Sequence, residues 1–190
     1  MRKINKQSKL KVLFIGNAAD VYEDKWWVDL DRKAFQNHDY EVVERDFRDI
    51  SKEELSSALS EVDVVHICGG SVFHILSLLK ENDFLQIIKK AVVDNEIIYT
   101  GTSAGSIIAS ERVGLYLYDD EEKKFLKENA DFTGLGFVNF LIIPHADSED
   151  FVESNKDMVG HAADINLPIV VLKDNQAVWV EDDKIQFLSK

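Results

Sequence analysis

Short apolar runs alternate with amphipathic segments along most of this 190-residue chain. Each run is long enough for a buried strand, and the segments between the runs carry apolar residues at helical spacing. This alternation is typical of an α/β fold with a mainly parallel sheet and helices on both faces. The runs are Lys11 to Ile15, Glu41 to Asp46, Val62 to Cys68, Glu96 to Thr100, Phe140 to Ile143 and Leu167 to Leu172.

Three segments between these runs are predicted crossover helices: Val28–Asn37, Lys52–Ser60 and Phe73–Val93. The C-terminal part differs, because two apolar runs there are separated only by a short acidic turn, which indicates an antiparallel hairpin over residues 177–188. The hydrophobic content of 45% suits a covered sheet. We therefore expect a doubly wound fold that forms one domain over residues 1–190.

The charge of the chain excludes two classes of partner. Lys and Arg number 22 against 35 Asp and Glu, a formal charge of -13, which repels both nucleic acid and anionic lipid. The apolar run at Leu10–Ile15 is too short for a signal sequence or a membrane span, so we expect a cytoplasmic protein. Cys68 is the only cysteine, which excludes an internal disulfide and a cysteine metal cluster.

Residues Gly101-Thr102-Ser103-Ala104-Gly105 form a G-x-S-x-G motif. The motif lies between a predicted strand and a possible helix start, which is the context in which many hydrolases expose a nucleophilic serine. A small-residue turn that packs a helix against a sheet has the same pattern. Other residues must therefore decide whether Ser103 is a nucleophile.

The residues that follow the predicted strands supply the remaining groups of an acyl-transfer site. In an open α/β sheet these positions share one rim. A serine hydroxyl needs a general base, and we assign that role to His145, with Asp174 as the carboxylate that orients it. The backbone N–H groups of Gly70 and Ala104 would form the oxyanion hole.

Each assignment has a structural alternative. His145 also suits a hydrogen-bonded histidine at a strand end, and Gly69-Gly70-Ser71 also suits a tight turn in which Ser71 caps the next helix. Two other acids, Asp119 and Asp120, follow the serine, although their charged surroundings are typical of a solvated turn. We favour Asp174, because its strand should neighbour the strand that precedes His145.

Four segments together resemble peptidase family S51, the aspartyl dipeptidase and cyanophycinase group. The likeness spans most of the chain. The segments are Ile67 to Leu76, Gly101 to Gly105, Gly134-Leu135-Gly136-Phe137 and Pro144-His145.

The resemblance implies a serine peptidase for short peptides on a fold similar to class I glutamine amidotransferases, without metal or cofactor. It places the nucleophile at Ser103, the base at His145, and the oxyanion hole at Gly70 and Ala104. The dipeptidase of this family has a glutamate where Asp174 stands. An additional aspartate downstream of the serine has been implicated in the group, which keeps Asp119 and Asp120 as alternatives.

The sequence departs from the dipeptidase in its basic groups. A pocket for a substrate aspartate needs a cation such as arginine, and no arginine follows Arg112. The stretch after His145 is acidic, which favours a basic or neutral substrate, although a solvated helix face has the same composition. We therefore do not expect strict aspartyl specificity.

Two competing functions remain. A noncatalytic member of the same fold could bind a small ligand or a partner. An esterase of the α/β-hydrolase type is disfavoured, because that fold places its acid before the histidine. The aromatic residues Tyr22, Trp26 and Trp27 could line the site, but they are more typical of buried packing.

Overall fold

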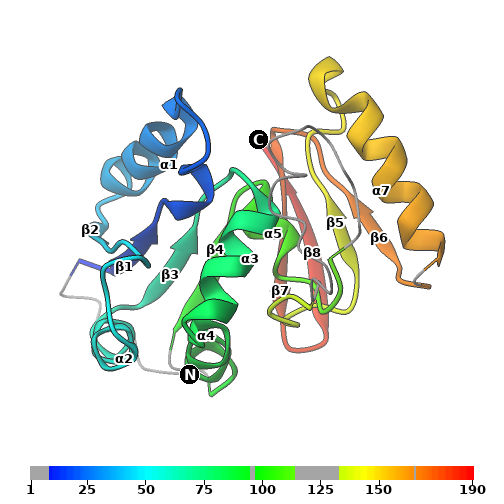
Figure 1. The fold of residues 1–190 in the computed structure, drawn as a ribbon. Coiled ribbons are helices and arrows are strands. Elements are labelled where there is room, and N and C mark those ends of the chain that lie inside the picture. The colour runs from blue at the N-terminus through cyan, green and yellow to red at the C-terminus, as the bar shows by residue number, and fades with distance from the viewer. Residues whose placement is uncertain (1–8, 95–96, 114–132, 165) are drawn as a thin grey trace. The chain divides into compact units, whose positions relative to one another are not determined.

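The computed structural model describes residues 9–94, 97–113, 133–164 and 166–190 (Figure 1). Contacts within the chain gather in two compact units, Met1–Ser106 and Ile107–Lys190. The expected single-domain organisation stays a prediction.

The first unit is a parallel sheet with strand order β2-β1-β3-β4. Its strands are β1 (Lys11–Ile15), β2 (Glu41–Glu44), β3 (Val64–Ile67) and β4 (Ile98–Gly101). Its helices are η1 (Asn17–Ala19), α1 (Trp26–Asn37), α2 (Lys52–Ser60), α3 (Val72–Glu81) and α4 (Phe84–Val93), and α5 (Ala104–Ile107) begins at its C-terminal end.

This strand order places helices on both faces of the sheet. The chain moves outward from β1 to β2, then crosses back over β1 to β3, so right-handed crossovers put α1 on one face and α2 on the other. Helices α2 and α3 both contact α4. The predicted doubly wound, mainly parallel fold is confirmed. The strand order reverses between β1 and β3, and ligands of such folds bind beyond the carboxyl ends of the strands at this point.

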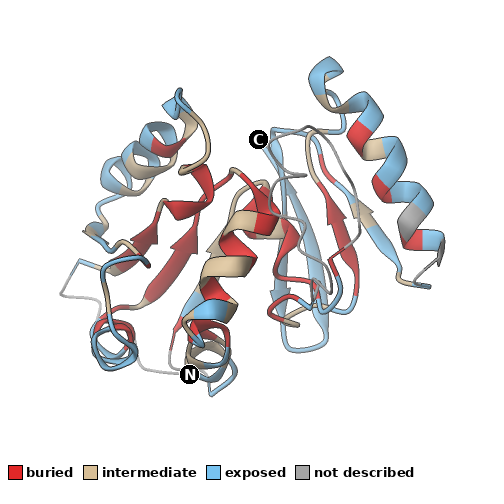
Figure 2. Cartoon of the chain, viewed as in Figure 1, coloured by how far each residue is buried: buried red, intermediate tan, exposed pale blue. Residues whose placement is uncertain are grey.

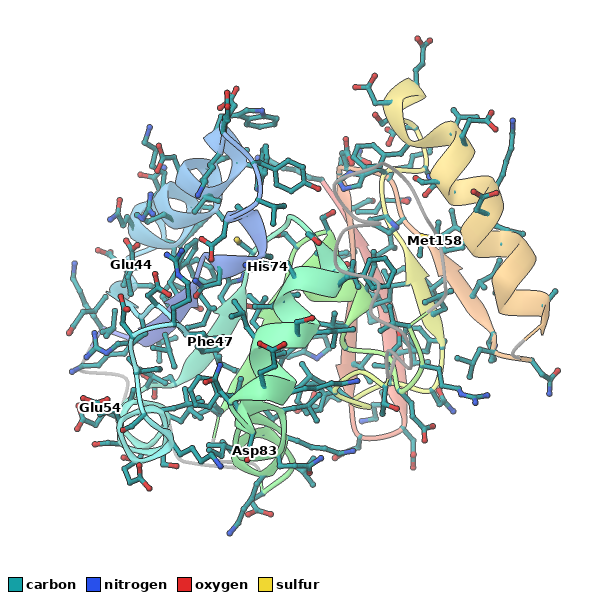
Figure 3. All side chains as sticks on the ribbon, viewed as in Figure 1. Glu44, Phe47, Glu54, His74, Asp83 and Met158 are labelled. Atoms are coloured by element: carbon teal, nitrogen blue, oxygen red, sulfur yellow. The ribbon has the colours of Figure 1, made fainter. Side chains whose placement is uncertain are left out.

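The core of the first unit lies around its two central strands. Every residue of β3 is buried, as are four of the five residues of β1 (Figure 2). Phe47, which follows β2, is fully buried, and its ring lies 5.2 Å from that of Phe84 on α4 (Figure 3). The apolar runs therefore form the core, as their sequences predict.

The predicted helical segment Phe73–Val93 is divided into two helices, α3 and α4. Asp83 between them has a φ of 55°, a left-handed conformation that ends a helix. The Asn82 side chain donates a hydrogen bond of 2.9 Å to the carbonyl oxygen of Leu78. Apolar periodicity continues through the break, so the division is not visible in the hydrophobic pattern.

The second unit contains a parallel strand pair and an antiparallel hairpin. Its elements are β5 (Leu141–Ile143), η2 (Glu149–Phe151), α7 (Val152–Asp164), β6 (Ile169–Val171), β7 (Gln176–Glu181) and β8 (Lys184–Ser189). Strands β5 and β6 are parallel, and β7 and β8 form the predicted C-terminal hairpin. Phe140, Ile142 and Leu172 form a small core against which Val178 of the hairpin packs. In the described residues, no helix is long and apolar enough to cross a membrane.

Replacement of Gly105 by alanine is expected to destabilise the fold. An added Cβ would lie 2.0 Å from the carbonyl oxygen of Ile67, a backbone atom that cannot move without distorting β3. We expect the free energy of unfolding in urea to fall by about 2 kcal/mol or more, as in other overpacked sites.

The matched control is Gly160→Ala. Gly160 lies within α7, and an added Cβ there meets no atom within 4 Å. This variant should gain roughly 0.5–1 kcal/mol, because alanine favours the helix. Equal stability of the two variants would contradict the close approach at Gly105.

Candidate functional site

Ser103 lies in a sharp turn between β4 and α5 and has a φ of 46°. The turn is possible because two glycines flank it. A Cβ on Gly101 would lie 2.4 Å from the backbone carbon of Gly105, and one on Gly105 would lie 2.0 Å from Ile67 O. The Tyr99 hydroxyl donates a hydrogen bond of 2.5 Å to the Gly105 carbonyl. Burial raises the pKa of Tyr99 above its ordinary value, so the phenol remains a donor.

Positive φ angles single out Ser103 among the described residues. Six described residues other than glycine have a positive φ. Asn and Asp tolerate this conformation, and four of the six are of these types: Asp39, Asp83, Asn166 and Asp182. The other two are Ser103 and His145, and serine is not a type enriched there. Backbone strain of this kind clusters at functional sites.

A partly buried hydrogen-bond network holds the residue that precedes Ser103. The Thr102 hydroxyl donates a hydrogen bond of 2.5 Å to Asp31 Oδ2, and His66 Nε2 lies 3.3 Å from the same oxygen. His66 Nδ1 lies 3.0 Å from the hydroxyl of Thr100, and the His66 side chain is 3% exposed. Asp31 thus ties α1 to the serine turn. Asp31 was not among the predicted residues, because nothing in the local sequence of α1 marks it.

The glycine loop after β3 lies against the serine. Gly70 has a φ of 146°, and a Cβ there would lie 2.1 Å from the carbonyl oxygen of Ala18, so only glycine fits. A Cβ on Gly69 would lie 3.0 Å from Ser103 Cβ. Ser71 caps α3 by accepting a hydrogen bond of 3.1 Å from the backbone N–H of His74.

The predicted oxyanion-hole donors are available. Within the described chain, the backbone N–H groups of Gly70 and Ala104 donate to no protein acceptor. Ala104 is nevertheless buried. Buried N–H groups are normally paired, so a donor without an acceptor at this position suits a ligand oxygen.

His145 and Asp174 meet in the second unit. Strands β5 and β6 are paired in parallel, so the residues that follow them share one edge. His145 Nδ1 lies 2.6 Å from Asp174 Oδ1. Phe151 stacks on the imidazole with a centroid separation of 4.3 Å, and Asn155 donates to the His145 carbonyl at 3.3 Å. The Asp174 side chain is 61% exposed and that of His145 is 25% exposed.

The remaining predicted acids, Asp119 and Asp120, lie outside the described residues. Ser103 belongs to the first unit, whereas His145 and Asp174 belong to the second. In the described parts of the chain, no cluster of His, Cys, Asp and Glu side chains is arranged to hold a metal ion.

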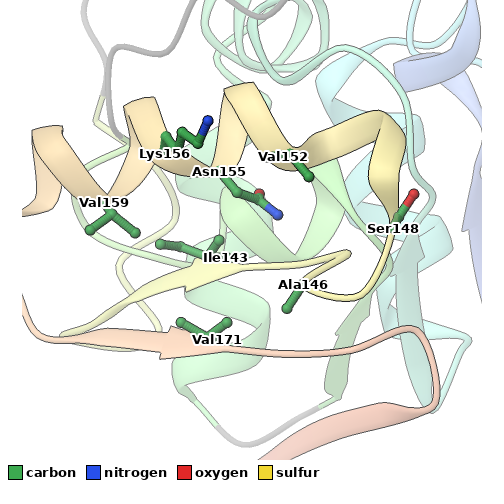
Figure 4. Close-up of a pocket in the computed structure, with 8 residues that line it drawn as sticks. All are labelled: Ile143, Ala146, Ser148, Val152, Asn155, Lys156, Val159 and Val171. Atoms are coloured by element: carbon green, nitrogen blue, oxygen red, sulfur yellow. The ribbon is translucent and has the colours of Figure 1, made fainter.

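A hollow of about 390 Å³ lies between α7 and the β5–β6 pair in the second unit (Figure 4). Its lining is mainly apolar, and its one cation, Lys156, is paired with Glu153 at 2.5 Å. Asn155, which lines it, also bonds to His145. The lining residues are Ile143, Ala146, Ser148, Val152, Asn155, Lys156, Val159 and Val171.

The acidic stretch after His145 includes the amphipathic helix α7. Its inner face buries Ser154 and Met158, and Met158 is labelled in Figure 3. Glu153 and Asp157 are exposed on the same helix. These two acids therefore occupy a solvated face.

The aromatic residues after β1 do not share one environment. Trp27 is half-buried, and its indole N–H donates a hydrogen bond of 2.9 Å to the Gly69 carbonyl. Trp26 is 63% exposed. The expectation of buried aromatic packing is therefore wrong for Trp26, because the first turn of α1 directs this ring away from the core.

Cys68 should be unreactive in the folded protein. It is fully buried, and desolvation raises the pKa of its thiol to about 12, so it carries almost no thiolate at neutral pH. We expect iodoacetamide to label Cys68 in 6 M guanidinium chloride but at least about 100-fold more slowly in the folded protein at pH 8. Mass spectrometry measures both rates. Rapid labelling of the folded protein would contradict this burial.

Comparisons with known proteins place the chain in a family. The model of peptidase family S51 matches residues 1–188. An uncharacterized peptidase of Pasteurella multocida is 28% identical over 181 residues, which cover 94% of this chain and 84% of that protein. Peptidase E of Shewanella amazonensis is 28% identical over 137 residues, 69% of this chain and 56% of that protein.

Solved structures agree with the fold. A crystal structure of a candidate peptidase E from Listeria monocytogenes EGD-e superposes with a TM-score of 0.85 at 24% identity, covering 99% of this chain and 89% of that one. A peptidase from an acI-B1 Actinobacterium gives a TM-score of 0.66 at 16% identity, covering 95% and 74%. The resemblance found in the sequence is confirmed, and the chain belongs to peptidase family S51.

Proposed function

We propose that this chain is a serine peptidase that hydrolyses short peptides through an acyl-enzyme on Ser103. The observation that carries the proposal is the serine turn. Ser103 has a positive φ between a strand and a helix, the Gly69–Gly70 loop packs against it, and two backbone N–H groups beside it have no acceptor among the described residues. These are the parts that an exposed nucleophile and its oxyanion require.

In the proposed reaction His145 is the general base. It takes the Ser103 proton as the oxygen attacks the peptide carbonyl, and it returns that proton to the leaving amine. The N–H groups of Gly70 and Ala104 stabilise the negative oxygen of the tetrahedral intermediate. Water then attacks the acyl-enzyme, gives its proton to His145, and releases the acid with Ser103 restored.

Asp174 is the proposed acid of the triad. Its hydrogen bond to His145 Nδ1 supports this role, because it would leave Nε2 to act on the serine. The backbone N–H of Asp174 donates to Asp147 at 3.2 Å, which helps to fix the loop. The carboxylate is largely solvated, so water can replace part of its effect. Its contribution should be smaller than that of a buried triad acid.

Strict aspartyl specificity is not part of the proposal. Lys156, the only cation between His145 and Asp157, is already paired with Glu153. A substrate carboxylate would have to compete with Glu153 for it. The proposed substrate class is therefore short peptides without a requirement for aspartate.

A serine-reactive phosphonate tests the nucleophile. Wild-type protein should be labelled at Ser103, and Ser103→Ala should show no labelling by intact mass. Unchanged labelling of Ser103→Ala would contradict the proposal that Ser103 is the nucleophile. No labelling of the wild type, together with no cleavage of a dipeptide library, would favour a noncatalytic binding protein of the same fold.

Kinetics of three variants test the other groups. We expect His145→Ala to lower kcat by about 10³-fold or more with little change in KM, because the base acts mainly in the transition state. Asp174→Asn should lower kcat by only about 10- to 100-fold, because its solvated carboxylate contributes less than a buried one. The control Asp182→Asn changes an equally charged residue in the hairpin turn, where asparagine tolerates the φ of 51°. If kcat is unchanged in Asp174→Asn, then the acid of the triad is Asp119 or Asp120 and not Asp174.

A further inference from the structure

Tyr22, Trp26 and Trp27 form an aromatic wall in the first unit. The ring of Trp27 lies 5.5 Å from that of Tyr22 and 5.9 Å from that of Trp26, with both pairs nearly perpendicular. Trp26 is 63% exposed, and Leu30, one turn further along α1, is 59% exposed. The wall thus presents a large aromatic surface to solvent.

The wall lies beside the serine turn. Trp27 is fixed to the glycine loop by its hydrogen bond to the Gly69 carbonyl. A Cβ built on Gly69 would lie 3.6 Å from Trp27 Cδ1 and 3.0 Å from Ser103 Cβ. The Trp27 ring and the Ser103 side chain therefore both lie next to Gly69, each close to the position that a Gly69 Cβ would occupy. All three residues belong to the same unit, so this placement does not depend on the second unit.

Two acids, Glu23 and Asp24, lie between Tyr22 and Trp26 in the chain. Glu23 and Asp24 are exposed, and the Asp24 carboxylate accepts a hydrogen bond of 3.3 Å from the backbone N–H of Trp26. Among the ion pairs of the described residues, none includes Glu23 or Asp24. The nearby Lys25 lies 3.9 Å from Asp20 instead. The segment beside the aromatic rings therefore carries two acids that form no ion pair with a described residue and one lysine that lies near Asp20.

We propose that this wall is a substrate subsite that binds the basic side chain of a peptide, lysine or arginine. Tryptophan faces attract a cation through their quadrupole, and the apolar stem of either side chain packs on the same rings. The carboxylates of Glu23 and Asp24 add attraction for a cation and disfavour an acidic side chain. The net charge of -13 acts in the same direction over longer distances. This inference rests on the proposed peptidase function of Ser103.

Two phosphonate esters test the subsite. They react with serine in the same way and differ only in the side chain, which is guanidinium-bearing in one and a neutral alkyl chain of the same length in the other. The expected result is that the guanidinium compound labels Ser103 about tenfold faster at low salt, and that added salt reduces the difference. Equal rates, or a faster neutral compound, would overturn the subsite and leave the nucleophile intact.

Variants test whether the wall residues cause the preference for the guanidinium compound. Trp26→Ala and the double variant Glu23→Gln/Asp24→Asn should each reduce the ratio of the two labelling rates by about three- to tenfold. All three residues are exposed, so the core is unaffected. Trp179→Ala, which removes a half-exposed tryptophan from β7, is the control and should leave the ratio unchanged. An unchanged ratio in both wall variants would overturn the assignment of the site.

Equilibrium binding separates this inference from the proposed function. If neither phosphonate labels the protein, the nucleophile proposal fails, and binding to the wall is still measurable. In Trp179→Phe the only tryptophans are Trp26 and Trp27, whose fluorescence reports on the wall. Argininamide should bind more tightly than norleucinamide, and Glu23→Gln/Asp24→Asn should remove the difference. Equal affinities would overturn the inference.

Discussion

The close approach of Gly105 to strand β3 is the constraint on which the serine turn depends. The space beside the Ile67 carbonyl does not admit even a Cβ, so the start of α5 lies directly on the sheet. The chain must then reverse sharply between Gly101 and Gly105, and Ser103 takes a positive φ at the apex. The unusual backbone of the serine is therefore a consequence of how tightly the helix start packs on the sheet.

The same packing brings three separate segments to the serine. The glycine loop continues from β3, which adjoins β4, and Gly70 in turn lies against Ala18 after β1. Asp31 then connects α1 to Thr102 by a hydrogen bond. The strand order reverses between β1 and β3, and ligands of such folds bind beyond the carboxyl ends of the strands at this point. The candidate groups of the first unit therefore lie at the edge of the sheet where folds of this type bind ligands.

The sequence predicts the parts of this arrangement that depend on local pattern. Apolar runs identify the strands, and parallel pairing places the residues after β5 and β6 side by side, which brings Asp174 to His145. The hydrogen bond that Thr102 donates to Asp31 spans 71 positions, and although Thr102 lies inside the G-x-S-x-G motif, no motif marks Asp31. The exposure of Trp26 depends on the direction in which α1 leaves the loop, which an aromatic pair in the sequence does not reveal. Sequence patterns therefore predict which residues follow the strands better than they predict which helix contacts those residues.

Charge and exposure differ between the groups proposed for catalysis and those proposed for substrate selection. Two sets of groups in the first unit lie beside the serine: the Gly70 and Ala104 N–H groups, which have no acceptor among the described residues, and the partly buried Asp31 network. A fixed geometry of these groups would matter for the oxyanion and the nucleophile. The exposed groups, Trp26, Glu23 and Asp24, contact solvent until a ligand covers them. A cation that binds there keeps part of its hydration, so its attraction is modest and sensitive to salt. Such a subsite would select among substrates without binding any of them so tightly that release becomes slow.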